Sequence, residues 1–136
     1  MSAPPAGLAA AAERLIGAPF RLHGRDPHTG LDCIGVVILA LRAAGCDADI
    51  GCDYQLRMRS ITGLLAQVDR LPLTPADTLP AAAGDVLLVQ VSACQHHCLI
   101  QVAEGYIHAH AGLRRVVLSP QLPAGTVLRR WRLCSN

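Results

Sequence analysis

The sequence predicts an α+β domain in which N-terminal helices precede a C-terminal antiparallel sheet of about five strands. Apolar residues recur at helical spacing in the first half of the chain, whereas short β-rich runs separated by turn residues follow Gly84. Helices followed by antiparallel strands are typical of the α+β class. The chain has 136 residues, of which 51% are hydrophobic. Residues 1–136 are therefore expected to form one domain around one core.

The N-terminal half is predicted to contain three helices. The first ends before Pro19, because proline cannot continue a helix. The second is apolar on nearly every side, which indicates a buried central helix, and Gly45 supplies its C-terminal cap. The predicted helices cover about 6–17, 32–44 and 60–68, and the segments 20–30 and 71–83 are expected to be connections.

Five strands are predicted after Gly84. They cover 85–91, 98–103, 106–110, 115–118 and 127–133. Glu104 and Gly105 are typical turn residues, and a turn centred between them pairs residue 101 with residue 108. In that register a bulge or a longer turn is needed to bring His97 close to His108.

Composition and charge exclude several classes of function. The net charge is +2, the basic residues are scattered arginines, and only 3% of residues are aromatic, so nucleic-acid binding is not expected. No apolar run approaches the roughly 20 residues that span a bilayer. Residues 1–12 lack a positively charged segment, so we expect no Sec-type signal peptide and synthesis in the cytoplasm. The six cysteines occupy unlike settings, which predicts reduced thiols rather than a disulfide framework.

Cys33 is the strongest candidate for a nucleophile. It lies where the sequence Gly30-Leu-Asp-Cys-Ile-Gly35 leads into the central helix. A helix N-terminus carries about half a positive charge, which favours the reactive thiolate. A cysteine nucleophile also needs a base with an orienting partner, and the histidines at the beginning of one predicted strand and on the next strand can supply both. These histidines are His96, His97, His108 and His110.

Five short motifs follow one another along residues 10–118. They read FRLHG at 20–24, DCIG at 32–35, GDVLL at 84–88, HCLI at 97–100 and IHA at 107–109. In order and spacing they resemble the motifs of the NlpC-type cell-wall cysteine peptidases of the papain-like superfamily. The short members found in phage tails and gene-transfer particles are the most similar. The resemblance implies a papain-like NlpC-type fold, with the central helix packed on the sheet.

The resemblance also implies an activity and its residues. Cys33 matches the nucleophile, His97 the general base and acid, and His108 the residue that orients His97. Family members hydrolyse amide bonds of peptidoglycan stem peptides, commonly between γ-D-glutamyl and diaminopimelate residues, and no cofactor is implied. The backbone N–H of Cys33 is expected to help bind the oxyanion. Asp32 is expected to shape the helix entrance or to contact a substrate amine.

Two features depart from the family pattern. The family strand often reads HVGI, whereas Cys98 and Leu99 follow His97 here, so the packing beside the base is altered. The loop before the central helix usually carries a tyrosine whose hydroxyl supports the oxyanion or substrate, and this chain has Phe20 there. Losing one such donor costs a factor of roughly 100 to 1,000 in rate. His23 is a candidate replacement, and His110 is a candidate substrate contact. Phe20 also motivates an alternative, a catalytically impaired domain that binds the wall or serves as a phage-tail part.

A zinc-binding structural module is the remaining alternative. The soft ligands for it are Cys94, His96, His97, Cys98, His108 and His110. Strand alternation sends neighbouring ligands to opposite faces, which argues against a metal site, and none is expected. His96 is otherwise expected at the surface or a strand edge, His28 in solvent, and Arg114, Arg115, Arg129, Arg130 and Arg132 on an exposed strand face.

The expected place of action follows from the resemblance and from the N-terminal sequence. Peptidoglycan stem peptides as partners place the protein at the cell wall or in the periplasm. A chain without a Sec signal needs another route there, and delivery in a phage-like particle, with tail proteins as partners, is the hypothesis.

Overall fold

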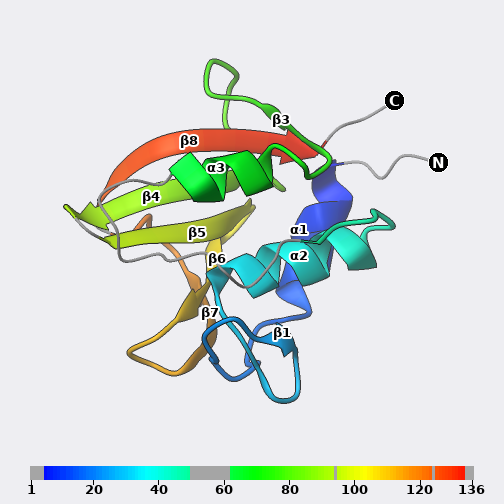
Figure 1. The fold of residues 1–136 in the computed structure, drawn as a ribbon, viewed down its shortest axis with the longest axis vertical. Coiled ribbons are helices and arrows are strands. Elements are labelled where there is room, and N and C mark those ends of the chain that lie inside the picture. Colours follow the sequence, from blue (N-terminus) through cyan, green and yellow to red (C-terminus); the bar gives the residue numbers. More distant parts are fainter. Residues whose placement is uncertain (1–4, 50–61, 94, 124, 134–136) are drawn as a thin grey trace.

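The computed structural model describes residues 5–49, 62–93, 95–123 and 125–133. The described helices are α1 (Pro5–Glu13), α2 (Cys33–Ala43) and α3 (Thr62–Val68). The described strands are β1 (Arg25–Asp26), β2 (Gly30–Leu31), β3 (Leu73–Pro75), β4 (Val86–Ser92), β5 (Gln95–Val102), β6 (Gly105–His110), β7 (Arg115–Ser119) and β8 (Thr126–Leu133). Helices come first and the main strands follow (Figure 1), which confirms the α+β prediction.

Strands β3 to β8 form one antiparallel sheet in the order β3-β8-β4-β5-β6-β7. Apolar side chains of the three helices and of one sheet face form the main core, and Leu87, Val89 and Leu99 form a smaller cluster. The main sheet has six strands in the described part of the chain, one more than the five predicted. The sixth strand, β3, lies at the sheet edge within the expected connection 71–83, and an edge strand tolerates Pro75 because the ladder there has one open side.

Helix α2 begins and ends on groups that the sequence provides. The Asp32 side chain caps its first turn by accepting a hydrogen bond from the Gly35 N–H at 2.7 Å. At the other end the N–H of Cys46 donates to the carbonyl of Leu41, and Gly45 has a positive φ of 93°. This is a Schellman arrangement, and it confirms Gly45 as the C-terminal cap. Cys33 is therefore held at the first position of a firmly capped helix.

Two details of the N-terminal region differ from the predictions. Helix α1 ends at Glu13 rather than near Gly17, because the chain continues in tight turns. The expected loop 20–30 contains the short β1–β2 hairpin. This hairpin region packs closely on α2, since a Cβ at Gly35 would lie 2.3 Å from the Gly24 carbonyl oxygen. The glycine of the DCIG motif thus permits the close approach of this loop to the helix.

The predicted register of β5 and β6 is wrong. Gln101 pairs with Tyr106 rather than with residue 108, because the turn is Ala103-Glu104 and Gly105 already belongs to β6. Gly105 is needed for packing, since a Cβ there would lie 2.1 Å from the carbonyl oxygen of Ser119 on β7. A glycine that resembles a turn signal therefore marks a close contact between strands.

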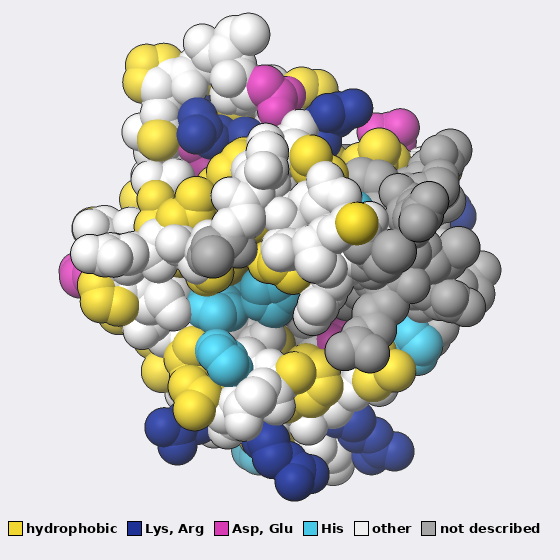
Figure 2. Space-filling view, turned by 90° about the vertical axis from the view of Figure 1, so that its left-hand side faces the viewer, with side chains coloured by type: hydrophobic (Ala, Val, Ile, Leu, Met, Phe, Trp, Pro, Cys, Tyr) yellow, Lys and Arg dark blue, Asp and Glu magenta, His cyan; other side chains and the backbone are white. Residues whose placement is uncertain are grey.

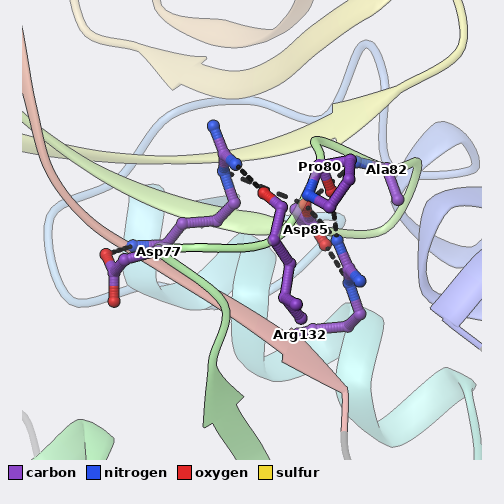
Figure 3. Close-up of polar contacts among 7 residues, drawn as sticks. Asp77, Pro80, Ala82, Asp85 and Arg132 are labelled. Atoms are coloured by element: carbon purple, nitrogen blue, oxygen red, sulfur yellow. Dashed lines mark hydrogen bonds and ion pairs between the residues drawn. The ribbon is translucent and has the colours of Figure 1, made fainter.

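The prediction of an exposed arginine face is wrong for Arg130 and Arg132. Asp85 is fully buried, and its carboxylate accepts hydrogen bonds from Arg132 at 2.8 and 3.1 Å and from the Ala82 N–H at 3.0 Å (Figure 3). Arg132 also donates to the Pro80 carbonyl, and Arg130 lies 3.9 Å from the same carboxylate. These contacts fasten β8 to the segment that leads into β4.

Candidate active site

Cys33 lines a cavity with a volume of about 740 Å³. Its side chain is 2% exposed, and its position at the start of α2 directs helix N–H groups toward the site. Figure 2 shows histidine side chains gathered in the middle of this face, flanked by hydrophobic ones. The described lining is Phe20, Leu22, His23, Asp32, Cys33, Val91, Gln95, His96, His97, His108, Ala109, His110, Ala111, Gly112 and Pro123.

Two histidines face each other where β5 and β6 separate. The strands pair only over the three positions nearest their turn, while β5 stays paired with β4 as far as Gln95 and β6 with β7 as far as His110. His97 and His108 belong to the separated parts, and His97 Nε2 lies 2.9 Å from His108 Nδ1. The contact is diagonal in the observed register, so it needs no bulge between these strands.

Both histidines of this pair have a further contact. On one side, the Cys33 thiol is hydrogen-bonded to His97. Because His97 Nε2 is engaged by His108, Nδ1 is the ring atom left for the sulfur. On the other side, His108 Nε2 lies 2.8 Å from Ser119 Oγ at the end of β7. The structure thus joins Cys33, His97, His108 and Ser119 in one line.

The pKa of the Cys33 thiol is lowered to about 5. The largest cause is a hydrogen bond with the Cys98 thiol; burial opposes it, and a hydrogen bond and the positive charge of His97 lower the pKa further. The same contact and burial raise the pKa of Cys98 well above its ordinary value. Cys98 therefore keeps its proton and donates it to the Cys33 sulfur, so that Cys33 is a thiolate at neutral pH.

Burial, assisted by the charges of His97 and His110, lowers the pKa of His108 to about 4. His108 is therefore neutral and carries a single ring proton. Accepting from His97 at Nδ1 places that proton on Nε2, which donates to Ser119 Oγ. A neutral acceptor at this position holds the His97 ring in one orientation.

The other predicted site residues fall into two groups. Asp32 is buried, and its carboxylate accepts from the N–H groups of Gly35 and His23 and from Arg25. Of the two roles expected for Asp32, these contacts correspond to shaping the helix entrance. Phe20 and His23 line the cavity, and His23 has a positive φ of 60°. The structure brings both of them to the site beside Cys33.

His110 and His96 also line the cavity. The His110 ring centroid lies 5.7 Å from that of His108, and its Nδ1 accepts from the Leu113 N–H at 3.0 Å. The prediction that His96 lies at the surface is wrong: it is 3% exposed and belongs to the cavity wall. His28 is exposed, as expected.

The described residues contain no group of three histidine, cysteine, aspartate or glutamate side chains arranged to hold a metal ion. Cys94, one ligand of the zinc alternative, lies outside the described residues. Cys33, Cys46 and Cys98 are free thiols, and Cys52, Cys94 and Cys134 also lie outside that part of the chain. None of the helices, over the residues described, is long and apolar enough to cross a membrane.

A solved structure shares this architecture. It is the crystal structure of the NlpC/p60 domain of the peptidoglycan hydrolase SagA, with a TM-score of 0.58 and 24% sequence identity, covering 96% of this chain and 98% of that chain. The chain has the fold of an NlpC/p60 domain. The predicted papain-like NlpC-type fold is thereby confirmed. No protein-family model and no curated protein matches the sequence.

Sequence reasoning missed two residues of this candidate site. Ser119 ends the line of contacts, but it lies one residue beyond the predicted strand 115–118 and is 86 positions from Cys33 in the sequence. Cys98 was considered only as a zinc ligand and as packing beside His97. A signal was present, since cysteine follows His97 directly in the motif HCLI, where a thiol can reach the same helix end.

Proposed function

We propose that the protein is a cysteine peptidase that hydrolyses amide bonds of peptidoglycan stem peptides, of the γ-D-glutamyl–diaminopimelate type. The observation that carries the proposal is the line Cys33, His97, His108 and Ser119 beside a cavity of about 740 Å³. A low-pKa thiolate, an adjacent imidazole and an orienting partner are the parts that acyl transfer needs. The resemblance of the five sequence motifs and the fold support peptidoglycan as the substrate class.

In the first step the Cys33 thiolate attacks the carbonyl carbon of the scissile amide. The developing oxyanion is met by the backbone N–H of Cys33, which as the first residue of α2 has no acceptor within the helix. His97 then donates its proton to the leaving amine as the C–N bond breaks, which leaves a thioester on Cys33 and a neutral imidazole.

In the second step His97 acts as a base. It removes a proton from water, the resulting hydroxide attacks the thioester, and the thiolate leaves as the carboxylic acid product forms. His108 Nδ1 lies 2.9 Å from His97 Nε2 and orients the base, and Ser119 Oγ, 2.8 Å from His108 Nε2, holds the His108 ring in place. His97 does not have to reorient during the reaction, because its contact with His108 is already formed before substrate binds.

Phe20 favours a second candidate function, a domain with weak or no catalysis that binds the wall as part of a phage-like tail. Phe20 lines the cavity without a hydroxyl to donate to the oxyanion. The similarity of the motifs to short phage-tail and gene-transfer-particle peptidases supports tail proteins as partners under either function. Co-purification with tail proteins is the expected result, and an exclusively free cytosolic pool would contradict this placement.

The test is digestion of purified peptidoglycan followed by mass spectrometry of the soluble fragments. We expect the wild type to release fragments with free D-glutamyl ends, and Cys33→Ala, with unchanged circular dichroism, to release none. Cys46→Ala is the matched control and is expected to retain full activity, because that thiol lies outside the cavity lining. Absence of fragments with the wild type, together with binding to peptidoglycan, would favour the tail-part function instead.

A further inference from the structure

Two stretches of the chain that border the cavity contain basic residues and no acidic ones. Residues of 20–23 and of 108–112 contribute to the cavity lining. The sequence has no aspartate or glutamate at 14–25 or at 105–136, the stretches that contain these two segments. Figure 2 shows basic side chains gathered along the lower edge of the face whose middle carries the histidines. A positive surface of this kind attracts anionic ligands.

Three exposed arginines lie on these stretches, and we call them the arginine rim: Arg21, Arg114 and Arg115. The Phe20 N–H donates to the Arg114 carbonyl at 3.0 Å, and Pro19 pairs with Arg115, so the two stretches lie side by side. The guanidinium groups of the rim make no ion pair or hydrogen bond with the described residues. Arginine keeps its positive charge across the physiological pH range. The rim is therefore accessible to an anionic ligand and charged when it arrives.

The arginine rim differs from the arginines that stabilise the fold. Arg25 is paired with the buried Asp32 at 3.2 Å, and Arg132 with the buried Asp85 at 2.8 Å. These pairs hold the loop at the start of α2 and the strand β8 in place. The rim has no carboxylate partner among the described residues, so its charge is not needed to compensate a buried acid. A partner outside the chain is the simplest use for it.

The substrate of the proposed function is itself anionic. A glutamyl residue linked through its γ-carboxyl group keeps its α-carboxylate, and the C-terminus of a stem peptide is a second carboxylate. The polymer places uncut stem peptides around the one that is cut, so their carboxylates surround the cavity of a protein seated on it. Guanidinium groups bind carboxylates through charge-assisted, often bidentate hydrogen bonds.

We propose that the arginine rim binds carboxylates of uncut stem peptides next to the one in the cavity, and so holds the protein on polymeric peptidoglycan. This inference rests on the proposed function. The rim lies beside the cavity lining rather than in it, which suits neighbouring stem peptides better than the scissile one. Several weak contacts with one polymer add up, because each later contact forms at a high effective concentration.

Cosedimentation of Cys33→Ala with purified peptidoglycan tests the inference without hydrolysis. We expect binding to weaken as sodium chloride rises from about 50 to about 500 mM, because salt screens exposed charges. Adding Arg21→Gln and Arg115→Gln should weaken binding at low salt roughly 2- to 30-fold, the range of two surface charge contacts. Arg114 is kept, because its positive φ of 61° would add a backbone effect to any replacement.

A matched control and two treatments of the peptidoglycan identify the ligand. Arg70→Gln with Arg129→Gln removes the same net charge from exposed arginines outside the rim, and should leave the affinity unchanged. Conversion of the peptidoglycan carboxylates to carboxamides should lower the affinity of the parent protein but not that of the rim variant. Removal of phosphodiester-linked polymers from the wall preparation should change neither. Circular dichroism checks that each variant is folded.

The outcomes separate the inference from the function on which it rests. Equal affinities of the rim variant and the matched control, or no effect of amidation, would overturn the inference. Loss of binding only on removal of phosphodiester polymers, or equal affinity for double-stranded DNA, would also overturn it. In these cases cleavage of a soluble stem peptide by the wild type leaves the peptidase function standing. Rim-dependent binding without any cleavage by the wild type would refute the peptidase function and support the rim as a wall contact.

Discussion

The contact between Cys98 and Cys33 leads to a prediction about the ionisation of the Cys33 thiol. A hydrogen bond from Cys98 is the largest cause that lowers the pKa of Cys33 to about 5. A hydrogen bond to a charged group contributes about 1.5 to 3 kcal/mol, and 1.36 kcal/mol corresponds to one pKa unit. Replacing Cys98 by valine, which removes the thiol and keeps an apolar side chain in the core, should therefore raise the pKa of Cys33 to about 6 to 7.

The assay is the pH dependence of alkylation. Cys33 is modified by iodoacetamide between pH 4 and 9, and its modification is quantified by peptide mapping in the wild type and in Cys98→Val. The thiolate is the reacting species, so the rate rises through the pKa and then levels off. We expect the midpoint near pH 5 in the wild type and a midpoint one to two units higher in the variant.

Two results would refute this reasoning. A wild-type midpoint near 8.5, the ordinary value for a thiol, would show that Cys33 is not activated. An unchanged midpoint in Cys98→Val would show that the neighbouring thiol does not stabilise the thiolate. Cys46→Val is the matched control, because Cys46 is a free thiol outside the cavity lining, and its replacement should leave the Cys33 profile unchanged.

Three further predictions concern the line of contacts and the fold. Ser119→Ala removes the acceptor of His108 Nε2, so kcat in steady-state assays should fall about 2- to 10-fold while thermal stability stays unchanged. An unchanged kcat would show that the functional contacts end at His108 and do not include Ser119. Asp85→Asn breaks a buried ion pair, and urea denaturation should show a loss of about 2 to 5 kcal/mol in the free energy of unfolding. Gly35→Ala forces a Cβ against the Gly24 carbonyl oxygen, and the same measurement should show a loss of about 1 to 3 kcal/mol; an unchanged stability would show that this loop yields easily.

Local signals made the helix start that carries Cys33 predictable. Asp32 before an apolar run with Gly35 three residues later describes a capped helix start, and the structure has that cap at 2.7 Å. The two strands carrying His97 and His108 were also predictable, because β-rich runs separated by turn residues have a clear pattern. Features decided within about ten residues of sequence were thus available without the structure.

Features decided by contacts between distant segments were not predictable. β3 is three residues long and becomes a strand only by pairing with β8, more than 50 residues away. The pair between Asp85 and Arg132 spans 47 positions, and Arg132 was expected on an exposed strand face. The burial of His96 depends on the separation of β5 from β6, which no local pattern indicates.

The most direct test of the account is a double-mutant comparison of His97→Ala and His108→Ala. If the two histidines act in one line with Cys33, the double variant should hydrolyse a stem peptide no more slowly than His97→Ala alone, because His108 acts only through His97. Losses in kcat/KM that multiply in the double variant would show that the histidines act independently, and would contradict the proposed arrangement of nucleophile, base and orienting residue.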